Sequence, residues 1–332
     1  MKRTWLITAI ALILIGCMTA VCALAALDWD FSRFSTVAFE TNTYPITEDF
    51  HNISLRTETA HITVLPADGA DAYIVCREQE NLRHTVTVTD GTLTVALSDD
   101  RKWYEYIGIS TESSTVTLYL PEAEYGTLLI RGSTGDVGIP KDFRFESISV
   151  EVSTGDVRCL ASAKGEIALR ASTGEIRAEG LSAKSLAFAV STGRVQVSSA
   201  ACEGAMLVTV STGKAELSDI RCGNLSSAGS TGDLLMERVR AAGSMLLSRD
   251  TGDIRFVACD AAEIKVTTDT GDVTGTLTSD KIFITESDTG TVRVPSSVAG
   301  GKCEITTDTG DIRIEVENKH GRDKPSLPCL YL

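Results

Sequence analysis

Four Asp-Thr-Gly triplets are the residues of this sequence whose types most directly suggest chemistry. In aspartic proteases, two carboxylates set in such triplets share one proton and activate water. Here the same place in a repeated pattern is held by Ser-Thr-Gly at six other positions, so the carboxylate is not required there. The pattern therefore predicts a structural turn and no catalytic residue. The aspartates of the four triplets are Asp250, Asp269, Asp288 and Asp308.

Calcium binding is a second chemistry that these four aspartates could support. If the repeats stack, equivalent aspartates follow one another at about 4.8 Å, close to Asp253, Asp272 and Asp311. Hard cations bind such clusters of oxygen ligands. The alternative is a solvated acidic edge, neutralised by arginines two residues beyond the acids, and the Gly-rich nonapeptide of calcium β-rolls is absent. We assign no metal site and keep the four aspartates as a calcium candidate. The arginines are Arg158, Arg177, Arg255, Arg293 and Arg313.

Cysteine and histidine complete the search for reactive side chains. The nine cysteines include no Cys-x-x-Cys pair, and the four histidines show neither metal-ligand nor catalytic-triad spacing. Cys202 and Cys222 each lie ten residues after the threonine of a repeat, so we expect them on adjacent coils. A disulfide and two buried thiols both fit this spacing. These residues indicate no cofactor and no small-molecule substrate.

A repeated Thr-Gly dipeptide is the strongest signal in the chain. It occurs ten times at intervals of 19 or 20 residues. Apolar and polar residues alternate on both sides of each dipeptide, as in Ile148 and Val150 before Thr154 and Val157 after it. This alternation predicts two short strands per repeat, with one face buried. The glycines fit tight corners that need positive φ; they are Gly135, Gly155, Gly174, Gly193, Gly213, Gly232, Gly252, Gly271, Gly290 and Gly310.

The repeats must stack, because a unit of 19 or 20 residues cannot bury a face alone. We therefore predict an all-β chain whose main domain, residues 126–317, is a parallel β-solenoid (β-helix) of about ten coils. An earlier coil has Ala60 in the glycine place. Residues 46–125 also contain a hairpin signal, Asp90-Gly91, and are expected to cap one end of the solenoid.

The N-terminus carries an apolar segment that we expect to be one transmembrane helix. Residues 5–27 contain no charged side chain, and as a helix of about 35 Å they would cross a bilayer. The basic stub, residues 1–4, predicts a cytoplasmic N-terminus and an extracytoplasmic bulk at the cell membrane. Two cleaved forms stay open: an ordinary signal peptide, and a lipoprotein signal with lipid on Cys17. The segments without pattern are a linker, 28–45, and a C-terminal tail, 318–332.

The net charge of the chain limits the classes of partner that it can bind. The formal net charge is −14 at pH 7, which disfavours nucleic acid. We expect contact with the membrane through the N-terminal segment, and with an unknown surface protein or wall polymer through the solenoid. Outward-facing apolar residues five positions before the threonine are candidates for that contact. They are Leu129, Leu207, Leu246 and Ile284.

These features together resemble a large bacterial family of putative adhesins, first described as a domain of unknown function. The match rests on the N-terminal segment, the strand Val116–Pro121 leading into Leu128–Val137, and the repeats, over about residues 46–316. The resemblance implies a β-solenoid at the cell surface, with no catalytic residues established for the family. We therefore expect a non-catalytic, membrane-anchored, adhesin-like protein. The alternatives are an envelope-stress or signalling accessory protein and, less favoured, a polysaccharide-acting β-helix enzyme.

Overall fold

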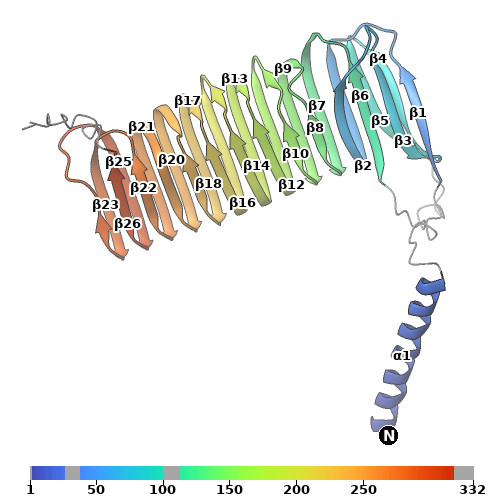
Figure 1. Ribbon diagram of the computed structural model, residues 1–332, viewed down its shortest axis with the longest axis horizontal. Helices are drawn as coiled ribbons and strands as arrows, with labels where there is room; N and C mark the ends of the chain where they lie inside the picture. The colour runs from blue at the N-terminus through green and yellow to red at the C-terminus, as the bar shows by residue number, and fades with distance from the viewer. Residues whose placement is uncertain (1, 27–37, 100–112, 318–332) are drawn as a thin grey trace, which may run out of the picture.

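The protein is a long rod of stacked strands with one helix at its N-terminus (Figure 1). The computed structural model describes residues 2–26, 38–99 and 113–317. Helix α1 covers Lys2–Ala26. Among the residues that the structure describes, no helix is long and apolar enough to cross a membrane. Attachment through the N-terminal segment stays a prediction, and the tail 318–332 lies outside the described residues.

In the three central coils, one long strand bends at the Thr-Gly dipeptide and is followed by a two-residue strand on a third side. In neighbouring coils, as in β9 (Arg144–Thr154) and β10 (Val157–Cys159), the long strand is divided at the dipeptide. Strand β14 (Ser185–Ser198) bends at Gly193 and is followed by β15 (Ala201–Cys202). It pairs in parallel and in register with β12 (Glu166–Glu179) and β16 (Ala205–Ser218). We predicted two strands per repeat, so the third side was missed. The remaining strands of the regular coils are β7 (Glu124–Thr134), β8 (Val137–Ile139), β11 (Ser162–Ala163), β13 (Ser182–Ala183), β17 (Arg221–Cys222), β18 (Asn224–Thr231), β19 (Leu234–Glu237), β20 (Arg240–Thr251) and β21 (Ile254–Thr270).

The core is a set of apolar columns that run along the rod. Leu186, Phe188 and Val190 of β14 point inward and are at most 2% exposed, and their partners on the next coil, beginning with Met206, are buried as well. Parallel pairing places equivalent side chains about 4.8 Å apart. Each coil therefore completes the core of its neighbours, as the repeat pattern predicted.

The Thr-Gly corner explains why glycine recurs there. All ten glycines have φ between +123° and +159°. At Gly193, with φ +142°, an added Cβ would lie 2.0 Å from the carbonyl oxygen of Gly174 on the neighbouring coil. Both the conformation and the close approach of two backbones exclude a larger residue.

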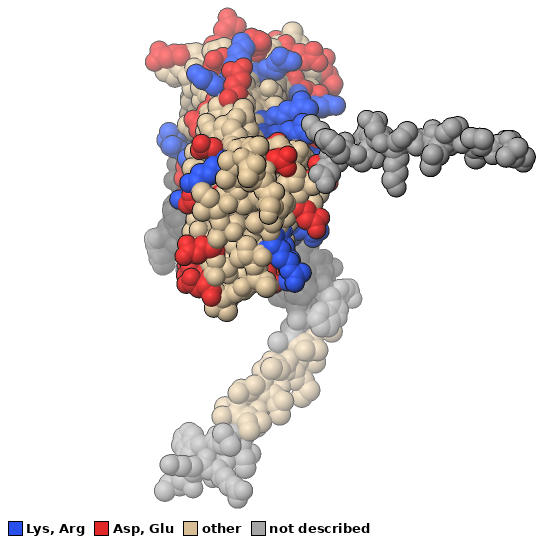
Figure 2. Space-filling view, turned by 90° about the vertical axis from the view of Figure 1, so that its left-hand side faces the viewer, with Lys and Arg blue, Asp and Glu red and all other residues tan. Residues whose placement is uncertain are grey.

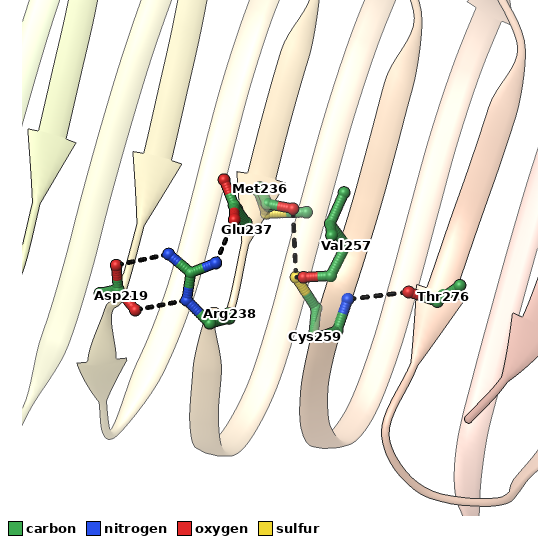
Figure 3. A network of polar contacts seen from close by, with 8 residues as sticks. Asp219, Met236, Glu237, Arg238, Val257, Cys259 and Thr276 are labelled. Carbon is green, nitrogen blue, oxygen red and sulfur yellow. Dashed lines mark hydrogen bonds and ion pairs between the residues drawn. The ribbon is translucent and has the colours of Figure 1, made fainter. Parts of the chain in front are cut away.

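A second corner follows seven residues after each of five threonines and needs no glycine. Its residues have φ between +52° and +70°: Gly180, Ser199, Asp219, Arg238 and Ala258. At Arg238, contacts with the preceding coil support this conformation, because its guanidinium forms a two-pronged ion pair with Asp219 at 2.6 and 2.7 Å (Figure 3). The Ala258 N–H donates to Thr276 Oγ1 at 2.8 Å in the same network. The sequence carries no single residue type here, so the pattern did not predict this corner.

The N-terminal end of the rod is covered by antiparallel strands. Strand β2 (Asn52–Pro66) forms the early coil, with Thr59 paired to Thr134 and Ala60 beside the corner of Gly135. Strands β5 and β6 stack on β2, and β1, β3 and β4 close the outside with antiparallel pairs. The early coil and the hairpin at Asp90-Gly91 lie in this region, and β1 falls within residues 28–45, which we expected to be a linker. These strands are β1 (Phe39–Pro45), β3 (Tyr73–Gln79), β4 (Leu82–Thr89), β5 (Thr92–Asp99) and β6 (Ser114–Leu120).

The C-terminal end departs from a sequential stack. The coil that bends at Gly310 lies directly on the coil of Gly271, and the coil of Gly290 is outermost. The chain thus passes over one layer and then returns to fill it. Figure 2 faces this end, whose centre is occupied by uncharged residues. The strands here are β22 (Val273–Leu277), β23 (Lys281–Thr289), β24 (Val292–Arg293), β25 (Gly301–Thr309) and β26 (Ile312–Val316).

Candidate functional site

An acidic residue follows most of the Thr-Gly dipeptides, and most of these carboxylates bond the next coil. Asp136 Oδ1 accepts the backbone N–H of Asp156 at 2.9 Å, and Asp156 Oδ1 accepts that of Glu175 at 2.8 Å. The same contact joins Asp253 to Asp272 at 2.9 Å. These carboxylates satisfy backbone donors that the corner leaves free. The acidic edge is therefore part of the architecture.

The four aspartates of the Asp-Thr-Gly triplets precede the Thr-Gly dipeptide, whereas the carboxylates that bond the next coil follow it. Asp250, Asp269, Asp288 and Asp308 are exposed, on four layers whose order is 250, 269, 308 and 288 because the last two coils are exchanged. Within the described residues, the geometry of a metal-ligand group is met only in the N-terminal cap. Calcium binding by the four aspartates stays a prediction that chelation can test.

A shallow trough runs along the third side of the coils, over β11, β13, β15 and β17. It consists of two hollows, of about 730 and 510 Å³, that meet at Arg221. Its floor is low because the third-side strands carry small side chains, among them Ala163, Ala183 and Ala241. One groove therefore spans consecutive coils, and the sequence did not predict it.

Cations line this trough. Five of six successive layers contribute at least one exposed Lys or Arg: Arg144 (with Lys141 on the same layer), Lys164, Lys184, Arg221 and Arg240. The remaining layer contributes Glu203. The five cations other than Lys141 stand nine to eleven residues after their threonines, so they share no single column of the repeat. This shift in register is why the sequence pattern did not identify them.

Most of the trough cations have no carboxylate partner. Lys164 forms an ion pair with Glu124 at 2.9 Å. Within the described parts of the chain, the other four make no ion pair. At the C-terminal end of the trough, Lys281 is buried and donates to Asp260 Oδ1 at 2.8 Å. That pair closes the cationic stretch.

The two cysteines expected on adjacent coils are neighbours at the floor of the trough. Cys202 and Cys222 are 8% and 6% exposed, and both are free thiols. Contact with the neighbouring Cys222 thiol holds the pKa of Cys202 below its usual range. The same contact and burial raise the pKa of Cys222. Parallel neighbours keep their Cβ atoms near the 4.8 Å strand spacing, which exceeds the roughly 3.8 Å typical of a disulfide.

The cap contains a buried polar cluster that the sequence did not indicate. Glu78 is fully buried and accepts hydrogen bonds from Asn42 Nδ2 at 2.9 Å and Tyr44 Oη at 2.7 Å. The backbone N–H of His84 donates to its other oxygen at 2.6 Å, and His84 Nδ1 lies 2.7 Å from that oxygen. Alternation places Glu78 and Cys76 on one face of β3, but only the fold brings His84 on β4 beside them.

Cys76, Glu78 and His84 offer three possible metal ligands whose donor atoms lie within 4.8 Å of one another. Burial and the charge of Glu78 raise the pKa of the Cys76 thiol to about 12, so it stays protonated at neutral pH. Burial also raises the pKa of Glu78, but hydrogen bonds from Asn42, Tyr44 and His84 outweigh it and hold that pKa below its usual range. With the thiol protonated and the carboxylate already bonded, the arrangement fits a structural network better than a metal centre.

The outward apolar residues do not form one continuous stripe. Leu207, Leu246 and Ile284 are 47–52% exposed, whereas Leu129 is half-buried. Small or charged residues on the adjoining layers separate them, since Leu207 pairs with Ala187 and Ser226, while Leu246 pairs with Ser226 and Lys265. The trough is therefore the more continuous candidate surface.

Comparison with known proteins agrees with this architecture. Residues 50–315 match the family described as Toastrack DUF4097. Among curated proteins, no match is found.

Solved structures with low sequence identity are also similar to this chain. One is a putative adhesin from Parabacteroides merdae, with 11% identity, a TM-score of 0.46, and 85% of this chain and 98% of that chain covered. Another is a putative lipid binding protein from Parabacteroides distasonis, with 15% identity, a TM-score of 0.44, and the same coverage of both chains.

Proposed function

Because this chain belongs to the Toastrack DUF4097 family, we propose that it is a non-catalytic surface protein whose solenoid holds an extended envelope polymer. The trough along the third side is the observation that supports this most. It crosses consecutive coils, so it offers a linear ligand the same kind of contact about every 4.8 Å. A compact substrate would use one layer of such a groove and leave the others empty.

The rigidity of the solenoid suits this role. Successive coils pair in register, and the core columns leave little freedom between layers. A groove on such a scaffold changes little on binding, so little ordering entropy opposes the contact. The cationic side chains must still be ordered, but their backbone positions are already set.

Attachment at the capped end is the second part of the proposal. The uncharged segment 5–27 precedes the described part of the solenoid, and the chain enters that part through β1, in the outer antiparallel layer of the cap. An anchor there would leave the trough free along the rod. In carbonate extraction of cells that express the full chain, we expect the protein to stay with the membrane pellet. Release of the protein into the supernatant would contradict the proposed membrane attachment.

Envelope binding is tested by sedimentation of the full-length chain with isolated envelope fragments. We expect the chain to pellet with the fragments and to release no soluble sugar on long incubation. Failure to pellet would contradict the binding role, whereas accumulation of soluble products would favour the enzyme alternative. A chain with Leu207→Ser and Leu246→Ser serves as a control, because these exposed leucines lie outside the trough.

A further inference from the structure

We infer that the trough selects a linear polyanion, a polymer with an anionic group on each repeating unit. This inference rests on the proposed function of the same trough and names the class of its ligand. The charge of the trough is opposite to that of the whole chain, which has a net charge of −14. Seven cationic side chains and only two carboxylates line the two hollows.

The cations are available to a ligand. Arg144, Lys184, Arg221 and Arg240 are exposed, and within the described residues none of them forms an ion pair with a carboxylate. The charge of Arg144 contributes to lowering the pKa of Glu124. Elsewhere on the rod, cations such as Arg177 and Arg238 already bond acids. A bound polyanion would therefore gain contacts without first breaking internal ion pairs.

Their spacing fits an extended chain. Arg144 and Arg240 lie five layers apart, which is about 24 Å along the rod. Arg144, Arg221 and Arg240 occupy one row, and Lys164 and Lys184 occupy a second row two residues further along the chain. The two rows let a ligand of moderate width meet cations from both sides. Glu203 interrupts the series once.

Two envelope chemistries present such a ligand: a phosphodiester-linked polymer and a polysaccharide of uronic acids. Both carry one anion per unit, and exposed Lys and Arg bind phosphate and carboxylate alike. The trough therefore predicts the charge and the linear form, and the experiment separates the two sources. Single-stranded nucleic acid shares the charge but depends on base stacking, and no aromatic side chain is exposed in the trough, where Phe143 and Phe145 are buried.

The test measures affinity of the full-length chain, held in a neutral detergent, for three probes of matched length. The probes are poly(glycerol phosphate), polygalacturonate and neutral dextran. We expect one or both anionic probes to bind, with an affinity that falls as salt is raised, and dextran not to bind. An oligothymidylate probe is included, and tighter binding to it than to both anionic probes would overturn the assignment to an envelope polymer.

Paired variants locate the contact. Lys184→Glu with Arg221→Glu should weaken binding of the anionic probe at least about tenfold, because two attractions become repulsions. Arg158→Glu with Arg255→Glu makes the same charge change on exposed positions outside the trough and should leave affinity within about twofold. Equal losses in both pairs would show that only overall charge matters and would contradict the inference. If dextran binds and the anionic probes do not, the ligand class is wrong although the binding function stands. If no probe binds while envelope fragments still sediment with the chain, the inference also fails.

Discussion

The Thr-Gly corner and the trough are two edges of the same coil with opposite charge and opposite bonding. At the corner, most acidic side chains bond the backbone of the next layer, as Asp136 does with Asp156. In the trough, Lys184 and Arg221 reach solvent and have no carboxylate partner among the described residues. A polar side chain that bonds the neighbouring layer is part of the architecture, whereas an exposed cation without an ion pair, as on four of the six trough layers, is available to a ligand. The corner should therefore govern stability, and the trough should govern binding.

The largest expected effect is at the corner glycine. Gly193→Val should cost more than about 3 kcal/mol of the free energy of unfolding, since it combines a forbidden φ with a backbone clash. Thr192→Val, next to it and exposed, should change this free energy by less than about 1 kcal/mol. Denaturant unfolding followed by circular dichroism measures both. Equal losses in the two variants would mean that the corner does not need glycine.

A buried, bonded carboxylate should matter nearly as much. Glu78→Gln would keep one oxygen for Asn42 and Tyr44 but place an amide donor against the N–H of His84. We expect a loss of roughly 2–4 kcal/mol in the free energy of unfolding at pH 7.

The pH dependence of the same variant gives a second readout. The pKa of Glu78 lies below its usual range in the folded protein, so its carboxylate stabilises the fold above the unfolded pKa of about 4.3. That contribution is lost as the pH falls through the lower, folded pKa. The difference between wild type and Glu78→Gln should therefore shrink between pH 5 and about pH 3. A difference that stays constant over this range would contradict the assigned bonding.

An exposed, bonded carboxylate should have a smaller effect. Asp156→Ala removes one acceptor for the N–H of Glu175, which water can replace in part, so we expect a loss of about 0.5–1 kcal/mol. Asp269→Ala, which removes an exposed aspartate that precedes its Thr-Gly dipeptide, should change the free energy of unfolding by less than about 0.5 kcal/mol. If the two substitutions lower the free energy of unfolding equally, the hydrogen bonds between corner carboxylates and the next coil contribute nothing beyond charge.

The trough cations should have the smallest effect on stability. Lys184→Glu with Arg221→Glu changes two exposed, unpaired side chains, so the free energy of unfolding should shift by less than about 1 kcal/mol. Thermal unfolding in the absence of any polymer measures this. A larger destabilisation would place these cations in the architecture and would erase the distinction between the two edges.

The repeat and its parallel stacking could be predicted from the sequence, because period-2 alternation and glycine spacing are local signals. The second corner could not, since its positive-φ positions hold residues as different as Ser199, Asp219 and Arg238, and the contact between Arg238 and Asp219 exists only once the layers stack. The exchanged order of the last two coils could not be predicted either, because no local feature of the sequence indicates it. The column residue Ile264 pairs with Cys303, and Phe283, its sequential equivalent, would suit the same column.

The candidate site was harder to predict than the fold. Thr-Gly spacing alternates between 19 and 20 residues, so the cations drift across three positions of the repeat and meet only when the third side is built. The buried Arg249 shows the same limit. It occupies an inward position, bonds Ser227 Oγ at 3.0 Å, and packs over Gly229, whose missing side chain leaves it room. Neither Arg249 nor Gly229, considered alone in the sequence, indicates that the two residues pack together.

Hydrogen–deuterium exchange of the full-length chain with and without the anionic polymer tests the distinction between the two edges most directly. The account predicts slower exchange at the third-side segments Ser182–Ala183, Ala201–Cys202 and Arg221–Cys222 when the polymer is bound. It also predicts no change at the Thr-Gly corners. Slower exchange confined to the corners would contradict the account and would place the binding surface on the opposite edge of the coil.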